Sequence, residues 1–332
     1  MATPSPLLRL PVLQADLARV EEELVASVRS EDPFLTEVAS HLIRAGGKRV
    51  RPAFTVTAAG IRGPQLEPAA QEVILGAVSV ELVHLGSLYH DDVMDDATTR
   101  RTVESVNARW GNLKAILAGD YLLAKASEIA ASLGTEVAGL LASTIGRLCE
   151  GQVLELQHTF DVARTETAYL ASIEGKTASL LATACRVGGL VAGLPRDDVE
   201  HLTSFGRDFG MAFQIVDDVL DVVATDEELG KPAGHDLLEG VYTLPVIRTL
   251  AEGGRAASRL GQLLGRPLAP SDLATARELV RSNGAVDGAL GTARRYVESA
   301  LGALEPFGAS ESAEALGAAA RHLLDSVAAI AS

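Results

Sequence analysis

The sequence predicts an all-α fold, a single large bundle of about 10–13 helices around a central active-site cavity. Almost every long segment repeats apolar residues at intervals of three and four, and the alternation typical of strands is essentially absent. Of the 332 residues, 47% are hydrophobic but only 4% are aromatic, so Ala, Leu and Val must fill the core, which favours closely packed helices. No Pro/Ser-rich linker or charge block divides the chain, and we expect one domain over residues 1–332.

The individual helices follow from this repeat and from the turn signals between them. Glycine pairs and X-Pro steps interrupt the pattern near residues 46–47, 63–68, 194–195, 230–240 and 265–270. Capping residues mark several helix starts, such as Thr165 before Glu166, and Ser271 or Asp272 before Leu273. The repeat therefore predicts helices over residues 12–30, 33–45, 50–60, 67–95, 104–110, 114–132, 135–159, 166–192, 197–224, 242–252, 272–282, 285–305 and 310–331.

Two aspartate clusters carry the strongest chemical signal in the chain. Asp91-Asp92-Val93-Met94-Asp95 and Asp217-Asp218-Val219-Leu220-Asp221 start 126 residues apart (217 − 91), and each ends a long predicted helix. Aspartates four apart share a helix face, where like charges about 4 Å apart repel by roughly 4 kcal/mol at an effective dielectric near 20. Carboxylates in apolar surroundings therefore require a cation, and such pairs leave Mg²⁺ free to bind water and diphosphate oxygens. The alternative, two solvated acidic faces, fits a single cluster better than two.

Charge and composition exclude several other classes. The formal net charge of −15 argues against nucleic acid as a partner, although metal ions and local cations can still favour an anion within one cleft. We find no basic region followed by an apolar run and no apolar stretch long enough for a transmembrane segment. Cys149 and Cys185 lack metal-ligand spacing. We expect a cytoplasmic protein.

Basic residues cluster at two places that suit phosphate. Lys48-Arg49-Val50-Arg51 follows a glycine pair, and Arg100-Arg101 follows the first aspartate cluster on an expected loop. Guanidinium groups bind phosphate oxygens through two parallel hydrogen bonds. The first run alone is more often a solvated turn than a site. Together with the aspartates, these residues offer two kinds of diphosphate binding, through metal ions and through direct cations.

An ordered set of motifs over about residues 45–250 resembles that of the trans-isoprenyl diphosphate synthases, the polyprenyl synthetase family. The motifs are Gly46-Gly47-Lys48-Arg49-Val50-Arg51-Pro52, Glu81 to Asp95 with Arg100-Arg101, Lys176-Thr177-Ala178, Phe213 to Asp221, and Gly230-Lys231-Pro232 with Asp236-Leu237 and Thr243-Leu244-Pro245. The resemblance implies a helical isoprenoid synthase fold, a homodimer, and transient membrane contact during product release. One position departs from the family pattern, because Val241 stands where a lysine is common.

The resemblance also implies a role for each motif residue. Asp91 and Asp95 would ligate two Mg²⁺ ions with Asp92 nearby, and Asp217 would hold a third. Two groups of side chains would bind the two substrates: Arg100, Lys176, Thr177, Gln214 and Lys231 the allylic diphosphate, and Lys48, Arg51, His84 and Arg101 isopentenyl diphosphate. The aspartates, Lys176 and Lys231 would form the catalytic set.

The implied reaction is the Mg²⁺-dependent head-to-tail (1′-4) condensation of isopentenyl diphosphate with an allylic diphosphate. The side chains before the first cluster, at Gly86, Ser87 and Val83, are small or medium-sized and predict a deep pocket for the growing chain. Each helical turn without a bulky side chain deepens that pocket by roughly 5 Å, and we expect a product of about 6–10 isoprene units. Alternatively, Gly86 serves only close helix packing. A short-chain synthase, a class I terpene cyclase and a non-catalytic synthase subunit are the competing interpretations.

Overall fold

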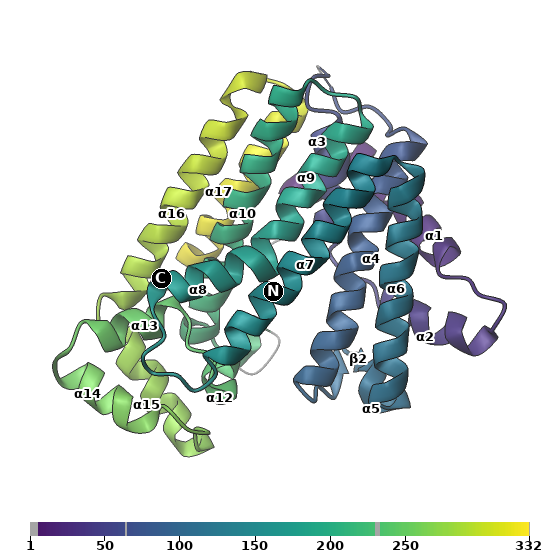
Figure 1. The fold of residues 1–332 in the computed structure, drawn as a ribbon. Helices are drawn as coiled ribbons and strands as arrows, with labels where there is room; N and C mark the ends of the chain where they lie inside the picture. The colour runs from purple at the N-terminus through teal and green to yellow at the C-terminus, as the bar shows by residue number, and fades with distance from the viewer. Residues whose placement is uncertain (1–5, 64, 230–232, 332) are drawn as a thin grey trace.

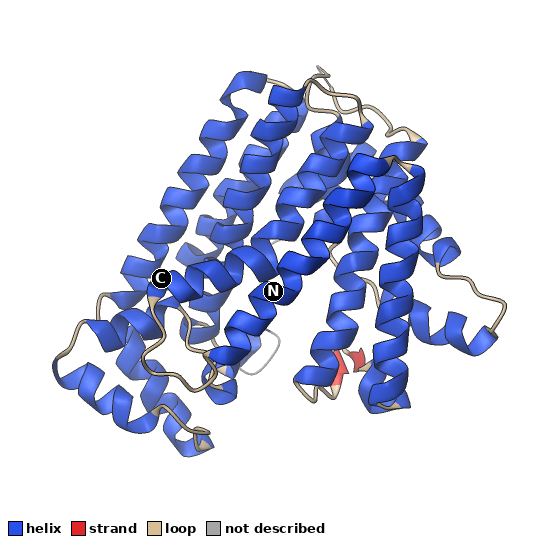
Figure 2. Cartoon of the chain, viewed as in Figure 1, coloured by secondary structure: helices blue, strands red, loops and turns tan. Residues whose placement is uncertain are grey.

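Helices make up nearly all the regular structure of the computed structural model, which describes residues 6–63, 65–229 and 233–331 (Figures 1 and 2). A two-stranded antiparallel hairpin of β1 (Thr99–Arg100) and β2 (Val103–Glu104) is the exception in this part of the chain, pairing Thr99 with Glu104. The helices are η1 (Pro6–Arg9), α1 (Pro11–Ser27), α2 (Pro33–Arg44), α3 (Val50–Ala59), α4 (Gln71–Met94), α5 (Val106–Trp110), α6 (Asn112–Ser132), α7 (Thr135–Gln157), α8 (Glu166–Ile173), η2 (Glu174–Ala178), α9 (Ser179–Val191), α10 (Arg196–Val223), α11 (Asp226–Leu229), α12 (His235–Glu239), α13 (Leu244–Ala251), α14 (Gly254–Leu263), α15 (Pro270–Arg281), α16 (Ala285–Leu304), η3 (Glu305–Phe307) and α17 (Glu311–Ala331).

This arrangement confirms the predicted all-α class. Some helix boundaries differ from the predicted ones. The segment predicted as one helix over residues 166–192 is divided by η2, a π-helical turn, into α8 and α9. The short helices α11, α12 and α14 were not predicted, because each is shorter than the window in which an apolar period can be recognised or begins at a glycine. Arg100 lies on β1 and Arg101 in the turn of the hairpin rather than on an irregular loop.

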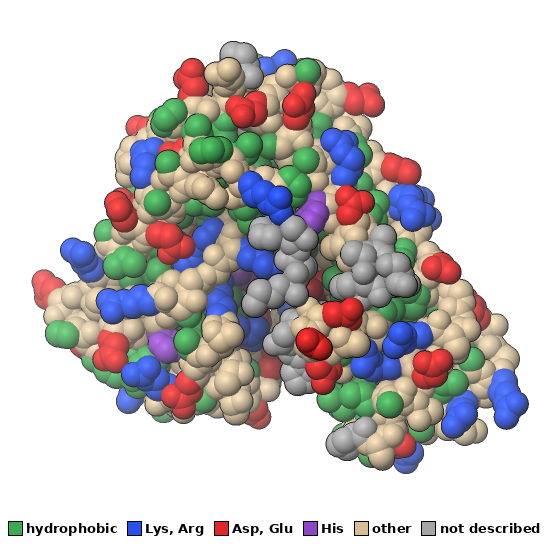
Figure 3. Space-filling model, turned by 180° about the vertical axis from the view of Figure 1, so that it is seen from behind, with side chains coloured by type: hydrophobic (Ala, Val, Ile, Leu, Met, Phe, Trp, Pro, Cys, Tyr) green, Lys and Arg blue, Asp and Glu red, His purple; other side chains and the backbone are tan. Residues whose placement is uncertain are grey.

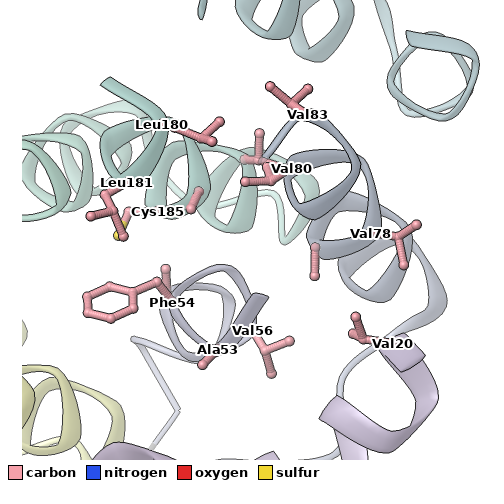
Figure 4. Packing of buried hydrophobic residues seen from close by; sticks show 14 of the residues in the cluster. Val20, Ala53, Phe54, Val56, Val78, Val80, Val83, Leu180, Leu181 and Cys185 are labelled. Atoms are coloured by element: carbon pink, nitrogen blue, oxygen red, sulfur yellow. The ribbon is translucent and has the colours of Figure 1, made fainter. Parts of the chain in front are cut away.

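The core shows how a chain with few aromatic residues closes its helix interfaces. Figure 4 shows Val80 and Val83 of α4 beside Leu180 of α9, with Phe54 of α3 on the other side of the cluster. α3 and α9 approach so closely at Gly188 that an added Cβ would overlap the backbone of α3. Small residues at such crossings allow backbones to pack directly, which explains the Ala- and Gly-rich composition.

Two long helices, α4 and α10, set the position of the site. α4 packs against α1, α3, α6 and α9, and α10 packs against α9, α13 and α16 (Figure 1). Within the described residues, α4 is the one helix long and apolar enough to cross a bilayer, but most of its apolar stretch is buried inside the bundle, as in the core helix of a globular protein. Acidic and basic side chains are mixed over the face shown in Figure 3.

Candidate active site

The first aspartate cluster lies at the C-terminal end of α4, where the chain turns into the β-hairpin. α4 ends at Met94, and the amide of Asp95 donates to the carbonyl of Asp91 at 2.9 Å. Asp92 is fully buried, and its carboxylate lies 2.6 Å from Nη2 of Arg100. The C-terminus of a helix carries partial negative charge, so the remaining carboxylates of Asp91 and Asp95 favour a bound cation there.

The second cluster lies in the last turns of α10, and Asp218 is its member that lines the adjacent cavity. The Asp218 carboxylate accepts hydrogen bonds from the Tyr169 hydroxyl at 2.5 Å and from Nε2 of Gln214 at 2.7 Å. Asp217 was the predicted metal ligand, but it is exposed and is not among the residues that line the adjacent cavity. Asp218 was not among the predicted site residues and must be added to them.

Asp221, the last member of this cluster, positions a neighbouring helix. Its carboxylate accepts hydrogen bonds from the backbone N–H groups of His235 at 3.3 Å and Asp236 at 3.2 Å. These are the first residues of α12, whose N-terminus therefore receives a negative charge. The contact fixes α12, which contributes Asp236 and Glu239 to the cavity wall.

The ends of α4 and α10 face a cavity of about 360 Å³ whose wall contains many charged side chains. We call it the polar cavity. Burial raises the pKa of Asp95 to about 6, with the Glu239 carboxylate adding to the effect, and burial raises the pKa of Asp218 to about 7. A bound cation would favour the ionised form of both carboxyls and lower these pKa values. The charged residues of its wall are Asp95, Asp96, Glu155, Arg164, Lys176, Asp218, Asp236 and Glu239.

Lys176 and Thr177 lie in η2, the π-helical turn between α8 and α9. Nζ of Lys176 donates to Glu155 at 2.6 Å, and the Thr177 hydroxyl donates to Gln214 at 2.8 Å. Burial acts to lower the pKa of Lys176, but Glu155 and the aspartates of the first cluster outweigh it and raise that pKa above its usual value. Such turns re-aim side chains and are frequent at functional sites. The turn thus brings a charged ammonium group to the wall of the polar cavity.

A second cavity of about 550 Å³, the apolar cavity, adjoins the first. It is largely lined by carbon atoms from α4, α6, α7 and α9, including Ser87, Leu88, Ile116, Leu148 and Leu180. Asp91, Arg51 and His84 also belong to its wall. The walls of the two cavities share Met94, Gln152, Leu156, Lys176 and Thr177, so a molecule with a charged head and an apolar tail can extend from one into the other.

The wall of the apolar cavity contains the cationic side chain of Arg51 together with His84. Nε of Arg51 is buried without a hydrogen-bond partner, and burial lowers the pKa of Arg51, although a guanidinium remains charged at neutral pH. Burial, followed by the charge of Arg51, lowers the pKa of His84 well below its usual value. His84 is therefore neutral and can donate a hydrogen bond without adding charge.

The other predicted basic residues lie at different depths. Arg49 is buried and donates to Glu81 at 2.9 Å and to Glu21 at 3.0 Å, so it fixes the loop before α3. Nη2 of Arg101 lies 3.9 Å from the same Glu81, so Arg49 and Arg101 share this buried carboxylate. Lys48 is exposed, and neither Lys48 nor Arg101 is among the residues that line the cavities.

The predicted chain-length residues do not share one face. Ser87 lines the apolar cavity, but a Cβ added to Gly86 would lie 3.1 Å from the carbonyl oxygen of Gly119 and 3.1 Å from the Leu123 side chain on α6. Val83 is fully buried in the core. The prediction that Gly86 lines the pocket is therefore wrong, because successive helical residues point about 100° apart and Gly86 faces a packed helix.

Several residues of the polar cavity were missed from the sequence. Arg164 precedes α8, Tyr169 lies within α8, and Glu155 lies near the end of α7; none of them belongs to a spacing that signals a site. Lys231, a predicted catalytic and substrate-binding residue, lies outside the described residues.

The donor set suits a hard divalent cation that shares its ligands with a substrate. Among the described residues, no three acidic, histidine or cysteine side chains are close enough to hold a metal ion by themselves. Mg²⁺ is usually bound through one or two carboxylates together with waters and substrate phosphates. Asp91 and Asp95, one helical turn apart and with burial raising the pKa of both carboxyls, fit that description.

Known proteins share both the sequence and the fold. A sequence model of the family described as Polyprenyl synthetase matches residues 32–280. The chain is 45% identical over 256 residues to nonaprenyl diphosphate synthase of Mycobacterium tuberculosis, covering 77% of this chain and 76% of that protein. It is 40% identical over 294 residues to heptaprenyl diphosphate synthase component 2 of Geobacillus stearothermophilus, covering 88% of this chain and 90% of that protein.

The structural match agrees with the sequence matches. The crystal structure of polyprenyl synthase from Caulobacter crescentus, complexed with calcium and isoprenyl diphosphate, superposes with a TM-score of 0.89 at 33% identity, covering 98% of this chain and 99% of that chain. The fold is that of the isoprenyl diphosphate synthases. The chain belongs to the polyprenyl synthetase family and is a prenyltransferase.

Proposed function

We propose that the chain catalyses the Mg²⁺-dependent head-to-tail (1′-4) condensation of isopentenyl diphosphate with an allylic diphosphate, giving an all-trans polyprenyl diphosphate. The observation that carries this proposal is the continuity of the two cavities. A polar cavity with two acidic helix ends opens directly into an apolar cavity with Arg51 and His84 in its wall. Two diphosphates and one hydrocarbon tail need such an arrangement.

The side chains divide the work between the two substrates. Asp91, Asp95 and a carboxylate of α10, Asp217 or Asp218, would hold three Mg²⁺ ions, whose charge would stabilise the diphosphate leaving group. Lys176 and Thr177 lie where they can bind the same group. Arg51 and His84, supported by Arg101 and Lys48, would hold isopentenyl diphosphate so that its double bond faces the allylic carbon. Closure over both diphosphates would exclude water from the carbocation.

We infer a product of about 6–10 isoprene units. The apolar cavity continues between α4 and α7 past the small side chain of Ser87, and among the described residues no Phe, Tyr or Trp lies in its wall. Long-chain synthases are among the relatives, but a geranylgeranyl diphosphate synthase is among them as well, so a short-chain product is the second candidate. A product of this length is strongly apolar, and we expect a cytoplasmic enzyme that contacts a membrane briefly at release.

Incubation of the purified chain with Mg²⁺, radiolabelled isopentenyl diphosphate and farnesyl or geranylgeranyl diphosphate tests the proposal. We expect linear polyprenyl diphosphates, identified by chain length after dephosphorylation, and no product in the presence of EDTA. A cyclic hydrocarbon would instead identify a terpene cyclase. No turnover by the purified chain alone would favour a subunit that needs a different partner, as the name component 2 of the Geobacillus relative suggests for that protein.

The exposed face of α6 and α7 favours a second copy of this chain as the partner. Leu113 and Leu117 on α6 are 80% and 65% exposed, and Val153 on α7 is 52% exposed. Ile116 and Val153 also line the apolar cavity, which therefore reaches this face. An identical face laid against it would bury these side chains and close the cavity to water, and we propose that the enzyme is a homodimer.

Replacement of Leu117 by Asp is expected to dissociate this dimer, because the new charge would be buried without a partner. Light scattering after size-exclusion chromatography should show the mass of one chain for L117D and of two chains for the wild type. Val162→Asp is the matched control, since Val162 is an equally apolar, 44% exposed residue on the loop between α7 and α8. A wild-type monomer, or an L117D dimer, would contradict the proposed interface.

A further inference from the structure

Arg164 is a buried cation in the wall of the polar cavity. It ends the loop between α7 and α8, only 4% of its surface is exposed, and it lies on the cavity wall together with Tyr169 and Asp218. Its guanidinium lies 5.5 Å from the centre of the Tyr169 ring. The side chain therefore belongs to the same wall as the network around Asp218, although no motif identified it.

Arg164 lacks the carboxylate partner that a buried arginine normally has. Nη1 donates to the carbonyl of Tyr242 at 3.1 Å and Nη2 to the hydroxyl of Ser172 at 2.6 Å, while Nε is buried without a partner. Both acceptors are neutral, and these bonds use two of the five N–H donors of a guanidinium. In the described part of the chain the salt bridges include none to Arg164, in contrast to the buried Arg49, which is bound to Glu81.

A buried charge without a directly bound carboxylate is costly, because Glu155 and Asp218 favour the Arg164 charge only from beyond salt-bridge distance, and an anion bound in the cavity would compensate it. The acidic residues of the wall cannot supply this anion by direct contact, because they do not come within salt-bridge distance of Arg164. Burial lowers the pKa of Arg164, yet the guanidinium stays charged at neutral pH. A diphosphate offers the oxygens that such a group binds best.

The loop that carries Arg164 is hydrogen-bonded to the residues on both sides of Val241. The N–H of Phe160 donates to the carbonyl of Gly240 at 2.8 Å, and Arg164 donates to the carbonyl of Tyr242. Val241 itself lines the polar cavity. Arg164 therefore lies beside the one position of the last motif where the chain has an apolar residue in place of a cation.

We propose that Arg164, in the wall of the polar cavity next to Val241, binds the diphosphate group of the allylic substrate and then the pyrophosphate that is released. This inference rests on the proposed function, because it identifies a further substrate-binding residue of the same site. The charge missing at Val241 is thus supplied by a neighbouring loop. Arg164 acts opposite the metal-binding aspartates, alongside Lys176.

Binding of inorganic pyrophosphate, measured by isothermal titration calorimetry with and without Mg²⁺, tests this role directly. We expect Arg164→Gln to weaken pyrophosphate binding about 10- to 100-fold, as for loss of hydrogen bonds to a charged group. Adding Val241→Lys in the same chain should restore most of the affinity, because a lysine there enters the same cavity. The control Arg147→Gln removes an exposed arginine that is paired with Glu174 on the surface, and it should bind as the wild type does.

A purely structural role for Arg164 predicts a different result. R164Q would then lower the melting temperature by loosening the loop at Tyr242, leave the pyrophosphate affinity of the folded protein unchanged, and gain nothing from V241K; that combination would overturn the inference. If the wild type makes no prenyl product but binds pyrophosphate through Arg164, the proposed reaction fails while the anion site stands. If the wild type elongates substrates and R164Q keeps the wild-type KM for the allylic substrate, the inference fails alone.

Discussion

Replacing Asp91 or Asp95 by Asn should lower kcat by roughly 10²- to 10³-fold each while leaving the protein at least as stable as the wild type. Asparagine keeps the shape of the side chain but removes the charge that would bind the metal ion. The two carboxylates end α4, where the helix dipole disfavours negative charge, and burial raises the pKa of both. Removing that charge relieves repulsion in the free protein, so activity and stability should move in opposite directions.

Steady-state kinetics over a range of Mg²⁺ concentrations, together with thermal unfolding, measure both effects. The Mg²⁺ concentration for half-maximal activity should rise in each variant. Glu72→Gln, an exposed acidic residue in the first turn of the same helix, is the control: it should leave the kinetics and the Mg²⁺ dependence unchanged and, because a carboxylate at a helix N-terminus is favourable, lower the stability only by about 0.3–1 kcal/mol. Asp92→Asn serves as a second comparison, because it breaks the buried pair with Arg100 and should lower the melting temperature. Full activity in D91N or D95N would remove the basis for a metal site at this end of α4.

The fold and the acidic ends of α4 and α10 could be predicted because their signals are local. An apolar period fixes a helix and its buried face, and a DDxxD cluster places two carboxylates one turn apart whatever the rest of the chain does. The sequence also identified the Lys176-Thr177 pair and Gln214, which the structure joins through a hydrogen bond between Thr177 and Gln214.

The residues that were missed depend on contacts between distant segments. Arg164 becomes part of the site only because its loop is fastened to the turn around residue 241, some 77 positions away (241 − 164). Asp218 rather than Asp217 faces the polar cavity because Tyr169 and Gln214 hold it there. The prediction for Gly86 was wrong for the same reason. The apolar period of a helix gives the spacing of its residues, but it does not tell which neighbouring helix each residue will contact.

Ser87→Phe should shorten the product. Ser87 lines the apolar cavity, and its hydroxyl donates to the carbonyl of His84 one turn earlier at 2.8 Å, so the side chain lies along the wall below Asp91. A ring at this position would block about one helical turn, roughly 5 Å, which is on the order of one isoprene unit. We expect the main product to lose at least one unit, with little change in the rate of the first condensation, as measured by chromatography of the dephosphorylated chains.

Gly86→Phe is the matched comparison, because the same ring one residue earlier points at α6. There it must displace the backbone around Gly119 and the Leu123 side chain, and we expect a loss of roughly 1–3 kcal/mol of unfolding free energy, typical of overpacking, with an unchanged chain length in the folded protein. If Gly86→Phe shortened the product and Ser87→Phe did not, the growing chain would run on the α6 side of the helix. Since the two positions are adjacent in sequence but point in different directions, the pair of variants locates the path of the chain relative to α4.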